Sequence, residues 1–182
     1  ELLDESGMDQ VLVFTRTKIG ADRLFSRLQR EGIDVAVLHG DRDMRQRQKA
    51  LETFAEGRVR VLVATDVAQR GLDVEGISHV VNFDVPQNPE DYVHRIGRTG
   101  RAGATGSAIT FLTPGELPQL HDIERTLGYK LPRVTVEGYD SALAAGPVAK
   151  PKIVVNRRGT RFGSRRADEL TPEELQELLK VG

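Results

Sequence analysis

The sequence has no cysteine and no tryptophan among its 182 residues, and only 5% of them are aromatic. The absence of cysteine excludes disulfides, thiolate nucleophiles and cysteine-ligated zinc or iron–sulfur sites. No apolar run approaches the roughly 20 residues that cross a bilayer, and no signal peptide opens the chain. We therefore expect a cytoplasmic protein without a membrane partner. The first residue is Glu1 rather than methionine, and we expect a fragment of a longer protein.

A formal net charge of −1 conceals an uneven distribution of charge along the chain. Between Ser141 and Ala167 there are seven basic residues and no acidic one. Such a segment attracts polyanions or stays solvated. His79 and His121 have no second candidate ligand near them in the sequence, so no metal site is predicted.

Short β-branched runs alternate with helical patterns, which is typical of an α/β fold around a parallel sheet. The sequence predicts strands at 10–14, 34–38, 59–64, 79–83 and 107–112. It predicts helices at 19–30, 44–54, 90–96 and 116–127. We expect one core domain over about residues 7–137.

The densest cluster of charge is the run from His94 to Gly103, which reads HRIGRTGRAG. Arg95, Arg98 and Arg101 recur at every third position, so a helix that leads into a turn would present them together. Guanidinium groups grip phosphate oxygens bidentately, and glycines let the backbone approach a bound anion. The run therefore predicts a phosphate-binding turn.

Hydroxyls, glycines and arginines also follow the predicted strands. Ligands of open parallel sheets collect at the carboxyl ends of the strands. Residues 15–18, 39–43 and 65–73 follow the first three strands, and we expect them to share one sheet edge with the Arg-rich turn. The set of side chains suits a phosphodiester backbone.

These segments resemble the motifs of a known family. Residues 11–17 (VLVFTRT) resemble motif IV, 64–73 (ATDVAQRGLD) resemble motif V, and 94–101 (HRIGRTGR) resemble motif VI of DEAD-box RNA helicases. The match covers about residues 7–137 and resembles the C-terminal domain, and we expect a bacterial RhlE-type member. It implies a RecA-like, P-loop NTPase-type three-layer fold, followed by a basic extension that ends in a short helix.

The resemblance also implies roles for individual positions. Arg98 and Arg101 match the catalytic arginines that reach the γ-phosphate of ATP, and Asp73 matches a carboxylate that binds the ribose. His94, Arg95 and Asp66 match positions at the junction with the partner domain, and Asp66 is also expected to brace motif VI. The positions that match RNA contacts are Thr17, Gly40, Arg47, Thr65 and Gly71.

Two features qualify the resemblance. Met44 stands where many members have Gln, and its side chain cannot donate a hydrogen bond to RNA. The sequence also lacks a G-x-x-x-x-G-K-[ST] loop and an Asp-Glu-Ala-Asp segment. The resemblance implies that ATP and Mg²⁺ are bound mainly by an N-terminal RecA-like domain of the same protein, and that this chain alone is inactive.

The segment after the core divides into two parts. Residues 138–169 read as a basic linker or tail, in which Arg157, Arg158, Arg161 and Phe162 could bind RNA by charge and stacking. The alternative is a solvated tail. Residues 170–182 predict a short amphipathic helix that docks on the core, on a second copy or on a partner protein.

Three functions are compatible with these features. The first is the C-terminal half of an ATP-dependent RNA helicase. The second is a related DNA translocase, against which the His94-Arg95-Ile96-Gly97 opening argues. The third is an isolated non-catalytic RNA-binding or dimerisation module.

Overall fold

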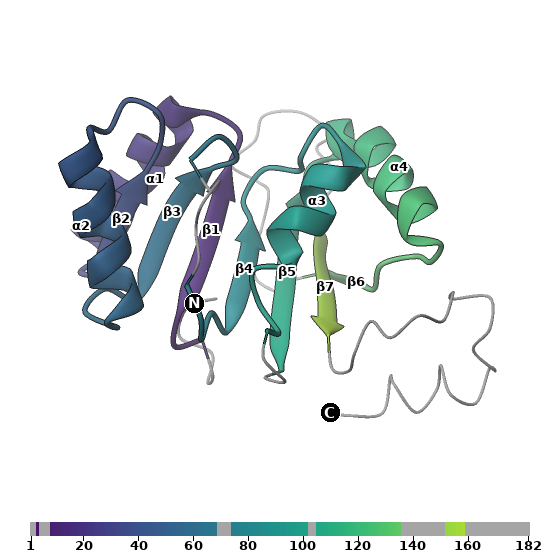
Figure 1. The fold of residues 1–182 in the computed structure, drawn as a ribbon. Coiled ribbons are helices and arrows are strands. Elements are labelled where there is room, and N and C mark those ends of the chain that lie inside the picture. The colour runs from purple at the N-terminus through teal and green to yellow at the C-terminus, as the bar shows by residue number, and fades with distance from the viewer. Residues whose placement is uncertain (1–2, 4–7, 69–73, 102–104, 136–151, 159–182) are drawn as a thin grey trace.

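The computed structural model describes residue 3 and residues 8–68, 74–101, 105–135 and 152–158. Within them, seven strands form one sheet in the order β2-β3-β1-β4-β5-β7-β6 (Figure 1). The strands are β1 (Val11–Thr15), β2 (Val35–Leu38), β3 (Val61–Thr65), β4 (His79–Asn82), β5 (Gly106–Leu112), β6 (Arg133–Thr135) and β7 (Lys152–Arg158). The helices are α1 (Lys18–Arg30), α2 (Met44–Ala55), α3 (Pro89–Ile96) and α4 (Leu117–Leu127), with a 3-10 turn η2 (Pro114–Glu116) before α4.

Strands β1 to β5 are parallel, as the alternation of strands and helices predicted. β1 and β3 are buried along their whole length, which explains their continuous apolar sequences VLVFT and VLVAT. A strand that is covered on both faces has no solvent side on which polar residues would be favoured.

The helices cover the two faces of the sheet unequally. α1 packs on one face over β1, β2 and β3, where its partly buried Leu24, Phe25 and Leu28 meet an apolar cluster. α2, α3 and α4 lie on the opposite face (Figure 1). This arrangement confirms the predicted three-layer, RecA-like α/β architecture.

Local signals explain where two of the helices begin. The Thr17 hydroxyl caps α1 by accepting a hydrogen bond from the Gly20 amide at 3.0 Å. Asp43 and Gln46 form a reciprocal capping box at the start of α2. Both caps lie just after strand ends, so they fix the loops at the carboxyl edge of the sheet.

One segment differs from its sequence interpretation. Residues 152–158, which we expected in a linker or tail, form β7 and pair antiparallel with β5, from Leu112↔Lys152 to Gly106↔Arg158. The β-branched run Ile153-Val154-Val155 favours a strand. β7 also covers the edge that β5 would otherwise expose. The flanking basic residues had directed the interpretation towards a tail.

Candidate functional site

A buried arginine organises the site. Arg95 of α3 is 1% exposed, and its Nε and Nη2 atoms each donate a hydrogen bond to the Asp66 carboxylate at 2.6 Å. Its Nη1 donates to the Asn82 side-chain oxygen at 3.1 Å and to the Asp84 carbonyl at 2.9 Å. The guanidinium also lies 5.1 Å from the centroid of the Phe14 ring. Arg95 thus ties α3 to the ends of three strands.

This geometry corrects one expectation. We expected Arg95 to face a partner domain, but four of its hydrogen bonds and nearly all of its surface are inside its own domain. The physical reason is that a bidentate pair with a carboxylate satisfies the N–H donors of a buried guanidinium. A guanidinium on an open surface needs water to satisfy the same donors. We also expected Asp66 to hold motif VI in place, and its ion pair with Arg95 agrees with that expectation.

The Arg-rich turn after α3 is anchored by Thr99. Thr99 is 4% exposed, and its hydroxyl donates to the backbone carbonyls of Ile77 and Ser78, which precede β4. Gly106, the first residue of β5, lies against this turn: an added Cβ would overlap the Thr99 hydroxyl and the Gly100 amide. Only glycine leaves room for so close an approach.

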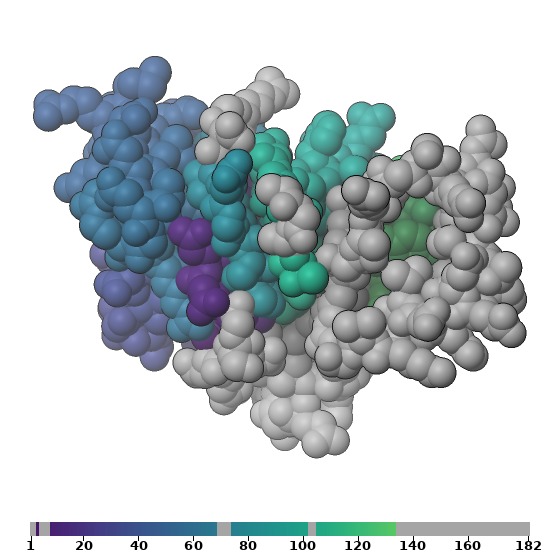
Figure 2. All heavy atoms as spheres, turned by 60° about the horizontal axis from the view of Figure 1, so that its bottom comes forward, coloured from purple at the N-terminus to yellow at the C-terminus, as the bar shows by residue number. Residues whose placement is uncertain are grey.

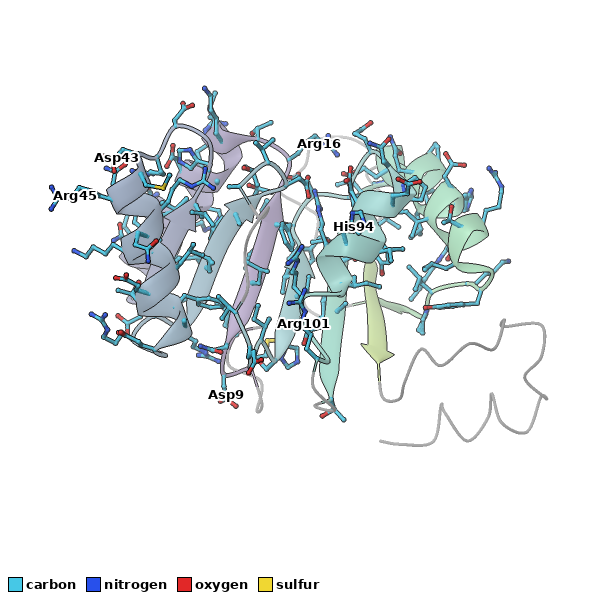
Figure 3. All side chains as sticks on the ribbon, in the orientation of Figure 1. Asp9, Arg16, Asp43, Arg45, His94 and Arg101 are labelled. Carbon is cyan, nitrogen blue, oxygen red and sulfur yellow. The ribbon has the colours of Figure 1, made fainter. Side chains whose placement is uncertain are left out.

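The position of the turn corrects a second expectation. We predicted that it shares the carboxyl edge with the loops after the strands. Instead α3 carries the chain back along the sheet, and the turn lies near the amino-terminal ends of β4 and β5. Arg101 accordingly lies towards the end of the molecule where Asp9 lies, away from Arg16 (Figure 3). A helix between two parallel strands must return to the opposite edge.

The three remaining side chains of interest in this motif differ in exposure. His94 is exposed, whereas Arg98 and Arg101 are partly exposed. The Arg101 Nε donates to the Gly97 carbonyl at 2.9 Å and so closes the C-terminal end of α3. The side chains of Arg98 and Arg101 therefore extend from a turn whose backbone is fixed by Thr99 and by the hydrogen bonds at the end of α3.

The loops at the carboxyl edge bring other predicted residues together. Thr17 and Gly40 are exposed, and Arg47 is partly exposed on α2. Thr65, at the end of β3, is 7% exposed. Met44, at the position where the family often has Gln, is 79% exposed. This edge presents hydroxyl, backbone and guanidinium groups to one side of the molecule.

A hydrogen-bonded triad shapes the loop that contains Gly40. His39 is 2% exposed and bonds through Nε2 to the Asp22 carboxylate at 3.1 Å, while its Nδ1 accepts from the Asp41 amide. Arg42 donates to the same carboxylate at 2.6 Å. Burial raises the pKa of Asp22, but His39 and Arg42 lower it more, so that this pKa lies below its ordinary value.

Several predicted site residues lie outside the part of the chain that the structure describes. They are Gly71, Asp73, Arg161 and Phe162. The expected terminal helix over 170–182 lies outside it as well. For Arg157 and Arg158 the structure describes only the backbone, which belongs to β7. Their roles stay predictions.

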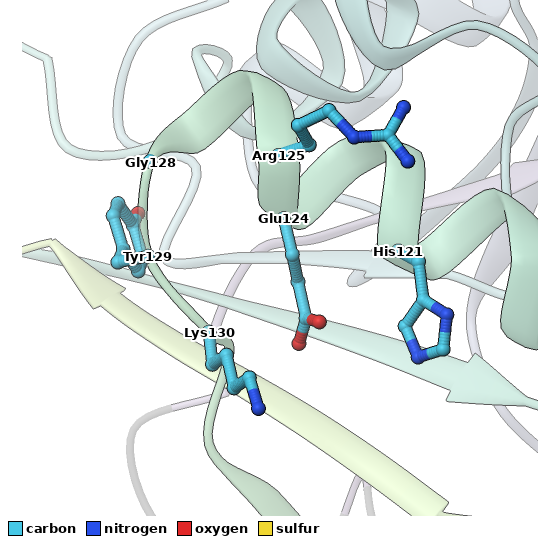
Figure 4. Close-up of a pocket in the computed structure, with 6 residues that line it drawn as sticks. All are labelled: His121, Glu124, Arg125, Gly128, Tyr129 and Lys130. Atoms are coloured by element: carbon cyan, nitrogen blue, oxygen red, sulfur yellow. The ribbon is translucent and has the colours of Figure 1, made fainter.

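One pocket, of about 490 Å³, lies away from both sets of residues. It is open to solvent at the end of α4 and is lined by His121, Glu124, Arg125, Gly128, Tyr129 and Lys130 (Figure 4). Another, of about 680 Å³, lies along α2 and includes Met44. Among the described residues, no cluster of histidine and acidic side chains could hold a metal ion. Nor is any helix there long and apolar enough to span a membrane.

Three residues of the site escaped sequence analysis. Asn82 is fully buried and links Arg95 to Thr110, to which it donates at 3.0 Å. The sequence signal for a buried polar residue was a single Asn within the apolar run VVNF. Thr99 and Gly106 meet across seven residues of sequence, and nothing in the sequence pattern indicated their contact.

Comparisons with known proteins support the interpretation of the motifs. Residues 1–103 match the family described as Helicase conserved C-terminal domain. A relative named DEAD-box ATP-dependent RNA helicase CshA, from Geobacillus kaustophilus, is 47% identical over 175 residues. The match covers 94% of this chain but 38% of that protein, so the chain spans just over a third of its length. The expectation of an RhlE-type branch is not supported, because this relative is a CshA.

Solved structures of DEAD-box proteins have the same fold as this chain. The Escherichia coli DEAD-box protein SrmB, bound to regulator of ribonuclease activity A, superposes with a TM-score of 0.68 at 39% identity, over 71% of this chain and 76% of that one. Saccharomyces cerevisiae Dbp5, bound to RNA and ADP BeF3, superposes with a TM-score of 0.61 at 38% identity, over 65% and 32%. The chain therefore belongs to the helicase conserved C-terminal domain family, in the form found in DEAD-box RNA helicases.

Proposed function

We propose that the chain is the C-terminal half of an ATP-dependent RNA helicase. In this proposal Arg98 and Arg101 act as arginine fingers on ATP that is held mainly by the N-terminal RecA-like domain of the same protein. The carboxyl edge of the sheet forms one side of a groove for RNA. Magnesium and the attacking water belong to the other domain.

The anchored Arg-rich turn is the observation that carries this proposal. Arg95 fixes the last turn of α3 to Asp66, and Thr99 fixes the next turn to Ser78, directly before β4. Charged groups that are positioned in advance stabilise a transition state without the cost of reorganisation at the moment of reaction. The side chains of Arg98 and Arg101 extend from this fixed backbone.

The opposite sheet edge supports the RNA part of the proposal. Thr17, Gly40 and Arg47 offer a hydroxyl, a backbone segment without a side chain and a cation. The loops that hold Thr17 and Gly40 are joined by the hydrogen bond from Lys18 to Asp41. These groups suit phosphate and sugar oxygens rather than base edges. RNA binding should therefore depend little on sequence. Dbp5, which contains a similar domain, is a precedent for a protein that is bound to both RNA and ADP BeF3.

The two surfaces lie at different ends of one rigid sheet. If ATP joins the Arg-rich turn to the other domain and RNA joins the carboxyl edge to it, both ligands favour the same closed arrangement of the domains. Hydrolysis removes one of the two links and favours reopening. This coupling would convert ATP hydrolysis into displacement of an RNA strand.

Strand displacement tests the proposal. We expect this chain, joined to its N-terminal RecA-like domain, to release one strand of a short RNA duplex in the presence of ATP, whereas the chain alone does not. RNA should stimulate its ATP hydrolysis more than DNA does. Stimulation by DNA alone would favour the translocase, and hydrolysis without any nucleic-acid dependence would contradict the proposal.

A further inference from the structure

The outer face of α1 carries arginines that no role above uses. Arg23, Arg27 and Arg30 are all exposed. Their spacing of four and three residues places them on one side of a helix. The opposite side carries Ala21, Leu24, Phe25 and Leu28, which pack against the sheet. The arginines therefore point away from the core. Ile19 lies at the start of the same row, and we call the four residues Ile19, Arg23, Arg27 and Arg30 the α1 stripe.

Six other described arginines have an acidic partner, whereas those of the α1 stripe do not. Ion pairs join Arg16 to Glu116, Arg42 to Asp22, Arg58 to Glu56, Arg95 to Asp66, Arg125 to Asp122 and Arg133 to Glu124. Among the described residues, no carboxylate lies within ion-pair distance of Arg23, Arg27 or Arg30. The Arg30 Nε donates to the Ser26 carbonyl at 3.2 Å.

Helix stability explains part of this pattern. Arg27 and Arg30 lie in the last turn of α1, where cations interact favourably with the helix dipole. Arg23 lies in the middle of the helix and gains nothing from that position. Three cations without an acidic partner on one helix face form a surface whose charge and spacing fit a polyanion.

The position of the α1 stripe indicates which polyanion. Thr17, in the loop that the proposed function assigns to RNA, caps the start of α1, and the helix runs back along the sheet for roughly 20 Å. Ile19 is 59% exposed in the first turn, between that loop and Arg23. The stripe thus continues directly from the RNA edge, and its apolar first member offers a surface for a nucleobase.

We propose that the α1 stripe binds the phosphates of single-stranded RNA that extends beyond the groove at the carboxyl edge. The inference rests on the proposed function and adds a second, sequence-independent segment to the RNA path. It predicts that affinity grows with RNA length past the point at which the groove is filled.

The test measures binding of the 182-residue chain to two labelled oligouridylates over a series of salt concentrations. The first is the shortest that binds, and the second is three times as long. In the variant Arg23→Gln/Arg27→Gln/Arg30→Gln, we expect weaker binding of the long RNA and unchanged binding of the short one. Each lost phosphate contact lowers the salt slope of a single strand by about 0.7, so three contacts lower it by about 2.

Two variants serve as controls. Arg58→Gln/Arg125→Gln/Lys130→Gln removes the same charge from exposed positions elsewhere and should leave the slope of the long RNA unchanged. Arg23→Lys/Arg27→Lys/Arg30→Lys keeps the charge and should restore most of the binding.

Three results would overturn the inference: an unchanged slope in the stripe variant, an equal loss in the control triple, or no binding of RNA by the wild-type chain. An acidic protein as the true partner would give the first of these. Failure of the proposed function appears instead in strand displacement by the joined protein, so the two failures can be told apart.

Discussion

Arg95 shows at the scale of one residue how the site is held. Replacement by Ala removes a buried cation from a pair in which the Asp66 side chain is 31% exposed, and it takes one donor each from Asp66, Asn82 and the Asp84 carbonyl. Breaking a fully buried pair destabilises a protein by about 3 kcal/mol or more, and partial exposure of one partner reduces the loss to about 2 kcal/mol. We expect Arg95→Ala to lower the free energy of unfolding in urea by that amount.

The pair between Arg125 and Asp122 is the matched control. Its side chains are 78% and 55% exposed, and exposed pairs contribute below about 1 kcal/mol. Arg125→Ala should therefore shift the urea midpoint little. Similar losses in both variants would show that Arg95 is not the structural centre of the motif.

The Asp22 carboxylate is expected to depend on its neighbours in a measurable way. Its hydrogen bond with His39 and the charge of Arg42 hold its pKa below 3.8. The interaction therefore stabilises the fold above that pH and loses its effect as the pH falls through the lowered pKa. Carbon-13 NMR titration should give a midpoint below 3.8 in the wild type and a higher one in His39→Gln. Equal midpoints would contradict this account of the triad.

At the scale of elements, the contact between the Arg-rich turn and β5 is the tightest feature. A Cβ at Gly106 would lie 2.9 Å from the Thr99 Cβ and closer still to the Thr99 hydroxyl and Gly100 amide. We expect Gly106→Ala to displace the turn and to destabilise the domain by about 1–3 kcal/mol. Thermal unfolding measures this. Gly115→Ala, where nothing lies within 4 Å of the added atom, should have almost no effect.

The elements also show what could be predicted from the sequence. The five parallel strands and four helices were predicted to within two residues at each end, because buried β-branched runs and helical periodicity are local signals. β7 was not predicted, although Ile153-Val154-Val155 favours a strand, because the flanking basic residues favoured a tail; it pairs with β5 across 40 to 52 positions. The burial of Arg95 was missed because its partners Asp66 and Asn82 are brought to it by the fold.

At the scale of the whole molecule, two candidate surfaces are held at separate ends of one sheet. Sequence order placed the Arg-rich turn together with the loops of motifs IV and V. In the structure Arg95 contacts Asp66 of motif V, but Arg101 lies towards the other end of the sheet from Arg16 of motif IV (Figure 3). Figure 2 shows the edge of the sheet at which the parallel strands begin. Atoms of β1 and of the chain near β4 lie side by side there, as the pairing of β1 with β4 requires. This separation suits a domain that binds two ligands at once and couples them through a rigid body.

The most direct test of the central claim is the effect of Arg98→Ala on ATP hydrolysis by the chain joined to its N-terminal domain, at saturating RNA and ATP. A finger that acts on the transition state should lower kcat by roughly a thousandfold and leave ATP affinity nearly unchanged. Arg125→Ala should leave both values as they are. An unchanged kcat in Arg98→Ala, or a loss explained entirely by weaker ATP binding, would contradict the account.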